Sequence, residues 1–150
     1  MNLKKLGTLF VFVLLTGCAG EIPKLGVVTG KLMQCPTKPN CINSQVSDDE
    51  HFIEPIISNK NPLQTKEQLI KILNDTKNSI IKEATNDYIR VEFVSTVFGF
   101  VDDVEFYFPT KNSKKVIVHV RSASRVGHSD FGVNRKRIEE IRNQLKLSDG

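Results

Sequence analysis

The spacing of apolar residues changes near the middle of the chain. From residue 79 onward, turn-like breaks separate four runs rich in valine, isoleucine, phenylalanine and tyrosine, at 79–85, 88–97, 100–108 and 114–124. Alternation with a period of two is typical of strands. The breaks are too short for helical crossovers, so we predict that neighbouring strands pair antiparallel.

Helical spacing flanks this strand region on both sides. In the first helix, Thr65 is the predicted N-cap because Gln68 follows three residues later, as in a capping box. Its expected buried face comprises Leu69, Ile72, Leu73 and Thr76. The second helix is predicted to be capped by Ser129 or Asp130. Its expected buried face comprises Asn134, Ile138, Ile141 and Leu145.

The order helix, four strands, helix predicts the fold class α+β. We expect a two-layer domain in which both helices cover the apolar face of one four-stranded antiparallel sheet. The polar stretch before the first helix shows no clear period and is expected to be irregular. The single domain is predicted at 34–147, preceded by a tether at 18–33.

The beginning of the chain has the pattern of a signal peptide, predicted at 1–17. Lys4 and Lys5 precede an apolar run at 6–15, and small residues follow it. Ten apolar residues rise only about 15 Å as a helix, against about 30 Å for a bilayer core. A permanent transmembrane span is therefore not expected.

Cys18 directly follows Leu-Thr-Gly, and this sequence resembles the lipobox of bacterial lipoproteins. The resemblance implies diacylation of the Cys18 thiol, cleavage before Cys18, and acylation of the new amino terminus with a fatty acid such as palmitate. The alternative is an ordinary secretory signal with a chance cysteine. Ala19 follows, and by resemblance to Gram-negative lipoproteins the absence of aspartate there implies a periplasm-facing anchor in the outer membrane. The membrane is thus the first expected partner.

Net charge changes this interpretation little. The chain has 21 basic and 17 acidic residues, and removal of Lys4 and Lys5 with the signal peptide leaves the mature chain near +2. So small an excess does not predict affinity for nucleic acid.

Cys35 and Cys41 are the other two cysteines, in the segment CPTKPNC. In an oxidising periplasm such a pair is predicted to form a disulfide that closes a short loop. A metal site, a redox site or a pair of free thiols is the alternative. Metal and thioredoxin-like sites usually have two residues between their cysteines rather than five. We expect no metal and no other cofactor.

Three segments together resemble a known bacterial family: CPTKPNCINSQ, FVDDVEFYF and VRSASRVGHSDFGVNRKRIEEIR. They are similar to the blocks of the family catalogued as domain of unknown function 1499. The resemblance extends from Cys35 to about Leu145. His128 departs from the family pattern, which often has tyrosine there. The resemblance implies the domain boundaries and an envelope setting, and supplies no catalytic residue.

The last of these segments contains a candidate anion site. Arg121, Arg125, Asn134 and Arg135 surround the predicted start of the second helix. Backbone N–H groups at a helix start bind carboxylate or phosphate, and arginine strengthens such binding. In the alternative, the Asp130 carboxylate occupies that helix start itself.

A salt-bridge network is the interpretation we favour for the same arginines. Alternation along the third strand places Asp103 and Glu105 on one face, where Arg121 can reach one of them. It places Asp102 toward the core, where an unpaired carboxylate is costly. We therefore expect Arg121 or Arg125 to pair with Asp102. The predicted network comprises Asp102, Asp103, Arg121 and Arg125.

Catalysis is not expected. Ser122, Ser124 and Ser129, with His128 and Asp130, supply the residue types of a hydrolase triad, but no G-x-S-x-G motif is present. We therefore predict a membrane-anchored envelope domain that binds or scaffolds another envelope component. The alternatives are a protein that binds a small anion or a phospholipid headgroup, and an envelope hydrolase.

Overall fold

The computed structural model describes residues 20–109 and 115–148. The predicted signal peptide and Cys18 lie outside the described residues. The elements in chain order are β1 (Val27–Val28), β2 (Lys31–Leu32), β3 (Cys41–Asn43), β4 (Ile56–Ser58), α1 (Pro62–Asp75), β5 (Ser79–Ala84), β6 (Tyr88–Val94), β7 (Val101–Tyr107), β8 (Val116–Ser124) and α2 (Val133–Leu147).

The main sheet has six strands, so the prediction of four was too low. The four predicted strands are β5 to β8, which pair antiparallel in chain order. Two short strands from the segment expected to be irregular pair with the other edge of β8. β3 pairs with Arg121–Ala123 and β4 with Val116–Val118, while β1 and β2 form a separate two-stranded sheet. Strands of three residues are too short to show a period in the sequence.

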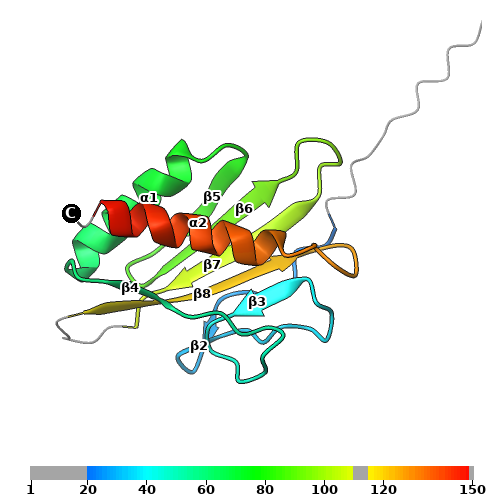
Figure 1. The fold of residues 1–150 in the computed structure, drawn as a ribbon, viewed down its shortest axis with the longest axis horizontal. Helices are drawn as coiled ribbons and strands as arrows, with labels where there is room; N and C mark the ends of the chain where they lie inside the picture. Colours follow the sequence, from blue (N-terminus) through cyan, green and yellow to red (C-terminus); the bar gives the residue numbers. More distant parts are fainter. Residues whose placement is uncertain (1–19, 110–114, 149–150) are drawn as a thin grey trace, which may run out of the picture.

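Both helices contribute to one hydrophobic core on one face of this sheet (Figure 1). α2 crosses the sheet and contacts β8, and α1 packs against α2 and β5. The buried sheet positions alternate as predicted and comprise Ile89, Val91, Val104, Phe106, Val118 and Val120. Burial of these side chains, at about 25 cal/mol per Å² of apolar surface, is the main force that joins the two layers. The mixed α+β class is therefore confirmed.

The helix starts differ from the predicted ones. α1 begins one turn earlier than expected, because the Asn61 side chain accepts a hydrogen bond from the Gln64 N–H (2.9 Å) and Pro62 occupies the first turn. Thr65 is fully buried inside the helix, and its hydroxyl donates to Ser58 Oγ (2.9 Å). At α2 the N-cap is Gly132 rather than Ser129 or Asp130, but the Asp130 carboxylate still accepts from backbone N–H groups at the helix start, as described below.

The second face of the sheet is charged rather than apolar. Cross-strand register places Glu92 beside Asp103, and places Glu105 between Arg90 and Arg121. Buried charged side chains are rare unless they are paired. This face of the sheet is therefore a second buried layer, formed by charged side chains that pair with one another.

Residues 20–33, which we call the N-terminal strap, cover part of this charged face. In Figure 1 the strap (blue) passes behind the sheet, on the side away from α2. The Gly26 N–H donates to Glu105 Oε1 (2.7 Å), and Leu32 is buried with its N–H bonded to Gln45 (2.8 Å). From Gly20 onward, the segment expected to be a tether thus has ordered contacts with the domain. No helix among the described residues is long and apolar enough to cross a membrane.

Candidate functional site at the disulfide loop and the end of β8

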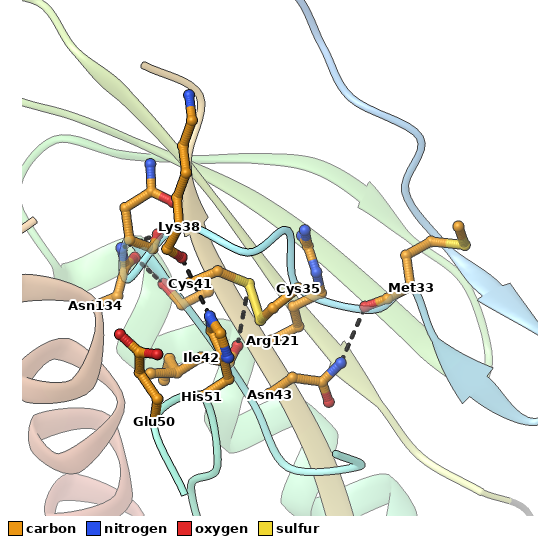
Figure 2. Close-up of a disulfide and its surroundings, with 12 residues drawn as sticks. Met33, Cys35, Lys38, Cys41, Ile42, Asn43, Glu50, His51, Arg121 and Asn134 are labelled. Atoms are coloured by element: carbon orange, nitrogen blue, oxygen red, sulfur yellow. Dashed lines mark hydrogen bonds between the residues drawn. A yellow bond between two sulfur atoms is a disulfide. The ribbon is translucent and has the colours of Figure 1, made fainter. Parts of the chain in front are cut away.

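The three segments singled out in the sequence meet at one end of the sheet. The loop before β3 ends beside β8, β7 lies next to β8, and α2 packs over both β8 and β3. Cys35 and Cys41 lie in disulfide geometry, with an S–S distance of 2.07 Å and a Cα–Cα distance of 5.6 Å. Figure 2 shows this pair between Asn134 of α2 on one side and Met33 of the strap on the other.

Asn40 connects the disulfide loop to the other segments. Its backbone carbonyl oxygen accepts from the Ser124 N–H (3.0 Å) and from Asn134 Nδ2 (3.1 Å). Its side-chain amide donates to the carbonyl oxygen of Gly127 (3.0 Å). Asn40 was not among the site residues predicted from the sequence, although its place between a proline and a cysteine in the loop was a signal. These bonds fix the loop against the end of β8.

His51 holds the other side of the disulfide loop. Its ring bonds the carboxylate of Asp48 and the carbonyl oxygen of Lys38 (3.2 Å). Burial lowers the pKa of His51, but these two hydrogen bonds outweigh it and leave the pKa above its usual value. The hydrogen bonds from His51 lower the pKa of Asp48.

On the helix face, Asp102 pairs with Arg137 of α2 at 2.6 Å. The prediction that Arg121 or Arg125 would pair with Asp102 was wrong. Both arginines project to the opposite face, so a partner for Asp102 has to come from the helix layer. Arg137 also donates to Asn134 Oδ1 (2.8 Å) and packs over the Phe93 ring, 4.6 Å from its centroid.

On the charged face, each of the two arginines has an acidic partner. Arg121 donates to Glu105 at 3.0 Å, and Arg125 donates to both oxygens of Asp103 at 2.7 and 2.8 Å. Asp103 and Glu105 share this face, as the alternation indicated. Arg125 also bonds Glu92. The predicted network thus divides between two faces, with Asp102 on one and the other three residues on the opposite one.

The pKa values on this face follow from the pairing. Burial raises the pKa of Glu92, but hydrogen bonding to Arg125 and the nearby positive charges leave it below its usual value. Hydrogen bonds to Asp103 outweigh burial and raise the pKa of Arg125. Burial and the neighbouring Glu105 carboxylate, which accepts from the Tyr88 hydroxyl at 2.8 Å, raise the pKa of Tyr88. Arg125 therefore remains charged and the Tyr88 phenol remains neutral across the physiological range.

The four residues of the candidate anion site do not line one site. Arg121 and Arg125 lie on the charged face, whereas Asn134 is fully buried on the helix face. Arg135 donates to the backbone carbonyl oxygen of Glu50 (3.3 Å). The start of α2 is occupied by Asp130, whose carboxylate accepts from the N–H groups of Gly132 (3.1 Å) and Asn134 (2.8 Å).

The residues considered for a hydrolase triad have other contacts. The hydroxyls of Ser122 and Ser124 both bond Asn134, and the Ser129 hydroxyl accepts from the Phe131 N–H (3.2 Å). His128 is exposed in the loop after β8. Within 20–109 and 115–148, no three histidine, cysteine or acidic side chains group as metal ligands.

A cavity of about 370 Å³ lies between the strap, the disulfide loop and the end of β8. Lys24 and Lys38 are among its lining residues, together with Met33, Arg121 and Asn40. Arg121 Nε and Asn40 Oδ1 are buried and have no hydrogen-bond partner among the described residues. A buried donor and a buried acceptor without partners are the features that a polar ligand or ordered water satisfies.

These observations define a class: a small two-layer α+β domain whose signature residues form ion pairs and hydrogen bonds across both faces of one sheet. A family model matches residues 31–145, from β2 almost to the end of α2. The chain belongs to that family, which is described as "Protein of unknown function (DUF1499)". No curated protein matches the chain significantly.

Proposed function

We propose that the protein is a lipid-anchored domain of the bacterial cell envelope that binds or scaffolds another envelope component without catalysis. The anchor is the acylated Cys18, and the domain faces the periplasm from the outer membrane. The lipobox-like sequence before Cys18 supports the anchor.

One observation carries the non-catalytic part of the proposal. The polar signature residues bond one another: Asp102 with Arg137, Asp103 with Arg125, and Glu105 with Arg121. Polar residues that bond one another stabilise the fold, so a structural role is enough to account for these residues without a catalytic one.

Mass spectrometry of the full protein, produced in a Gram-negative host, tests the anchor. We expect acyl mass on the Cys18 peptide and recovery in the membrane fraction, both lost in Cys18→Ala. Unmodified Cys18 would reject the anchor. Turnover of ester, phosphate or glycan substrates that Ser124→Ala or His128→Ala abolishes would reject the non-catalytic role.

A second candidate function is binding of a small anion or phospholipid headgroup in the cavity beside the disulfide loop. Two observations favour it. Arg121 Nε has no hydrogen-bond partner among the described residues, and Lys24 and Lys38 add positive charge to the cavity, against one lining carboxylate, Glu21. Calorimetry with inorganic phosphate and with glycerol phosphate tests this function. Binding should weaken at least tenfold in the double variant Lys24→Ala, Lys38→Ala and persist in the exposed control Lys77→Ala. Equal binding by both variants would reject the cavity.

A further inference from the structure

Exposed apolar side chains gather in two turns of the molecule. The turn between β6 and β7 exposes Val97 (81%) and Phe98 (68%), with Phe100 stacked on Phe98 at a centroid distance of 5.4 Å. The loop between β8 and α2 exposes Phe131 (95%) and, at the helix start, Val133. We call these five residues the apolar end patch. Grouped exposed apolar residues mark a surface that binds a partner or a membrane.

The two turns lie at the same end of the sheet. The Arg125 N–H, just past β8, donates to the carbonyl oxygen of Val101 at the start of β7 (3.0 Å). Arg137, in the second turn of α2, packs over Phe93 near the end of β6. Figure 1 shows the β6–β7 turn (yellow-green) and the β8–α2 loop (orange) together at one end of the molecule.

The chain also leaves the domain toward Cys18 at this end. Gly20 packs so closely on the residues after β8 that an added Cβ would lie 2.8 Å from Arg125 Cβ and 3.0 Å from Val126 Cγ1. Cys18 precedes Gly20 by two residues, and two residues span at most about 7 Å. An acylated Cys18 would therefore hold this end of the domain at the bilayer surface.

We propose that the apolar end patch inserts into the interfacial layer of the membrane that carries the acylated Cys18. This inference rests on the proposed lipid anchor and adds a second, noncovalent contact. Phenylalanine and valine side chains gain by transfer from water into the acyl boundary, and a second signal strengthens anchoring. The patch then orients the domain and limits its rotation about the anchor.

The charges near the patch suit a membrane surface. The β6–β7 turn, 95–100, contains no charged residue. The only acid of the β8–α2 loop is Asp130, whose carboxylate is held by the N–H groups of Gly132 and Asn134. The first turn of α2 adds Arg135 and Lys136, and cations near the surface favour anionic lipids.

The absence of tryptophan from the chain allows a direct test. Single-tryptophan variants Phe98→Trp and Phe131→Trp report on the patch. Leu147→Trp is the matched control, because Leu147 is equally exposed (83%) but lies at the far end of α2. Each full-length variant is processed in the host, purified, and reconstituted into phosphatidylethanolamine and phosphatidylglycerol vesicles with brominated acyl chains.

We expect blue-shifted emission and at least twofold quenching by bromine for Phe98→Trp and Phe131→Trp, with little change for Leu147→Trp. If neither patch variant is quenched more than the control while acyl mass is present on Cys18, the patch inference is wrong and the anchor stands. Blue-shifted emission without quenching, in a dimeric protein, would assign the patch to a second copy and overturn the inference. Absence of acyl mass rejects the anchor, whatever the fluorescence.

Discussion

Glu105 and Arg121 form an ion pair in which both side chains are almost completely buried. Glu105 is 0% exposed, and its carboxylate accepts from Arg121, from the Tyr88 hydroxyl and from the Gly26 N–H. A fully paired buried ion pair stabilises the fold little more than well-packed apolar side chains would. Removal of one partner, however, leaves the other charge buried and unpaired. The charged face therefore depends on the completeness of its pairing.

Glu105→Ala should lower the free energy of unfolding by about 3–5 kcal/mol, because it leaves Arg121 buried without its partner. Chemical denaturation measures this loss. The exposed pair Lys136–Glu140, at 3.9 Å, supplies the control: Glu140→Ala should cost less than about 0.5 kcal/mol. Equal small effects of the two variants would contradict a buried ionic interior.

On the helix face, Asp102→Ala should lower the free energy of unfolding by about 3 kcal/mol, because the largely buried Arg137 loses its acidic partner. Denaturation of the purified protein measures it. An unaltered midpoint would show that Asp102 contributes nothing to stability through burial.

Two histidines should act in opposite directions on the pH dependence of stability. Because the pKa of His51 is raised in the folded state, His51 adds to the free energy of unfolding. This contribution is fully present below about pH 6.5 and is lost as the pH rises through the folded pKa. Burial lowers the pKa of His119, so its contribution is present above about pH 6.5 and is lost as the pH falls.

His51→Gln should therefore make stability rise more steeply with pH between about 5 and 8, and His119→Gln should make it rise less steeply. Denaturation curves at several pH values give the two slopes. If both variants shift the slope in the same direction, one of the two assignments is wrong.

At the scale of elements, the start of α1 depends on one side chain. Asn61 accepts from the Gln64 N–H, and no acidic residue occupies the first turn. Asn61→Ala should cost about 1 kcal/mol of stability, and Asn61→Asp should retain it. Thermal unfolding measures both. An equal loss in the two variants would contradict capping by Asn61.

The elements predicted from the sequence are those whose pattern of apolar and polar residues repeats several times. Strands β5 to β8 and both helices have long runs, so their types were readable from local alternation. β3 and β4 have three residues each, and they form because β8 offers a free edge. That edge is distant in the sequence, so local alternation does not reveal it. Alternation likewise placed Asp102 inward, but its partner Arg137 depends on where α2 crosses the sheet. Arg90 and Glu92, which alternate with Val91 and Phe93, were an unused signal for the charged face.

At the scale of the whole molecule, segments far apart in the sequence are joined. Asn134 of α2 bonds Asn40, 94 residues earlier, and Arg142 donates to the carbonyl oxygens of Glu54 (2.7 Å) and Pro55 (2.6 Å). These bonds join the last helix to segments that precede α1 in the sequence.

We expect a single cooperative unfolding transition for the domain. Far-UV circular dichroism, which follows the sheet and helices, and tyrosine signals, which follow Tyr88 and Tyr107 of the charged face, should give the same midpoint. An earlier tyrosine transition would show that the charged face opens by itself.

The pairing of β3 and β4 with β8 has a consequence for the order of events in synthesis. The amino end of the chain is synthesised first, yet β8, the strand with which β3 pairs, follows it by roughly 80 residues. Closing so large a loop is slow, and during that delay the two short strands remain available to other chains. A nascent fragment that lacks its last quarter is thus a substrate for chaperones or proteases rather than a smaller version of the native domain.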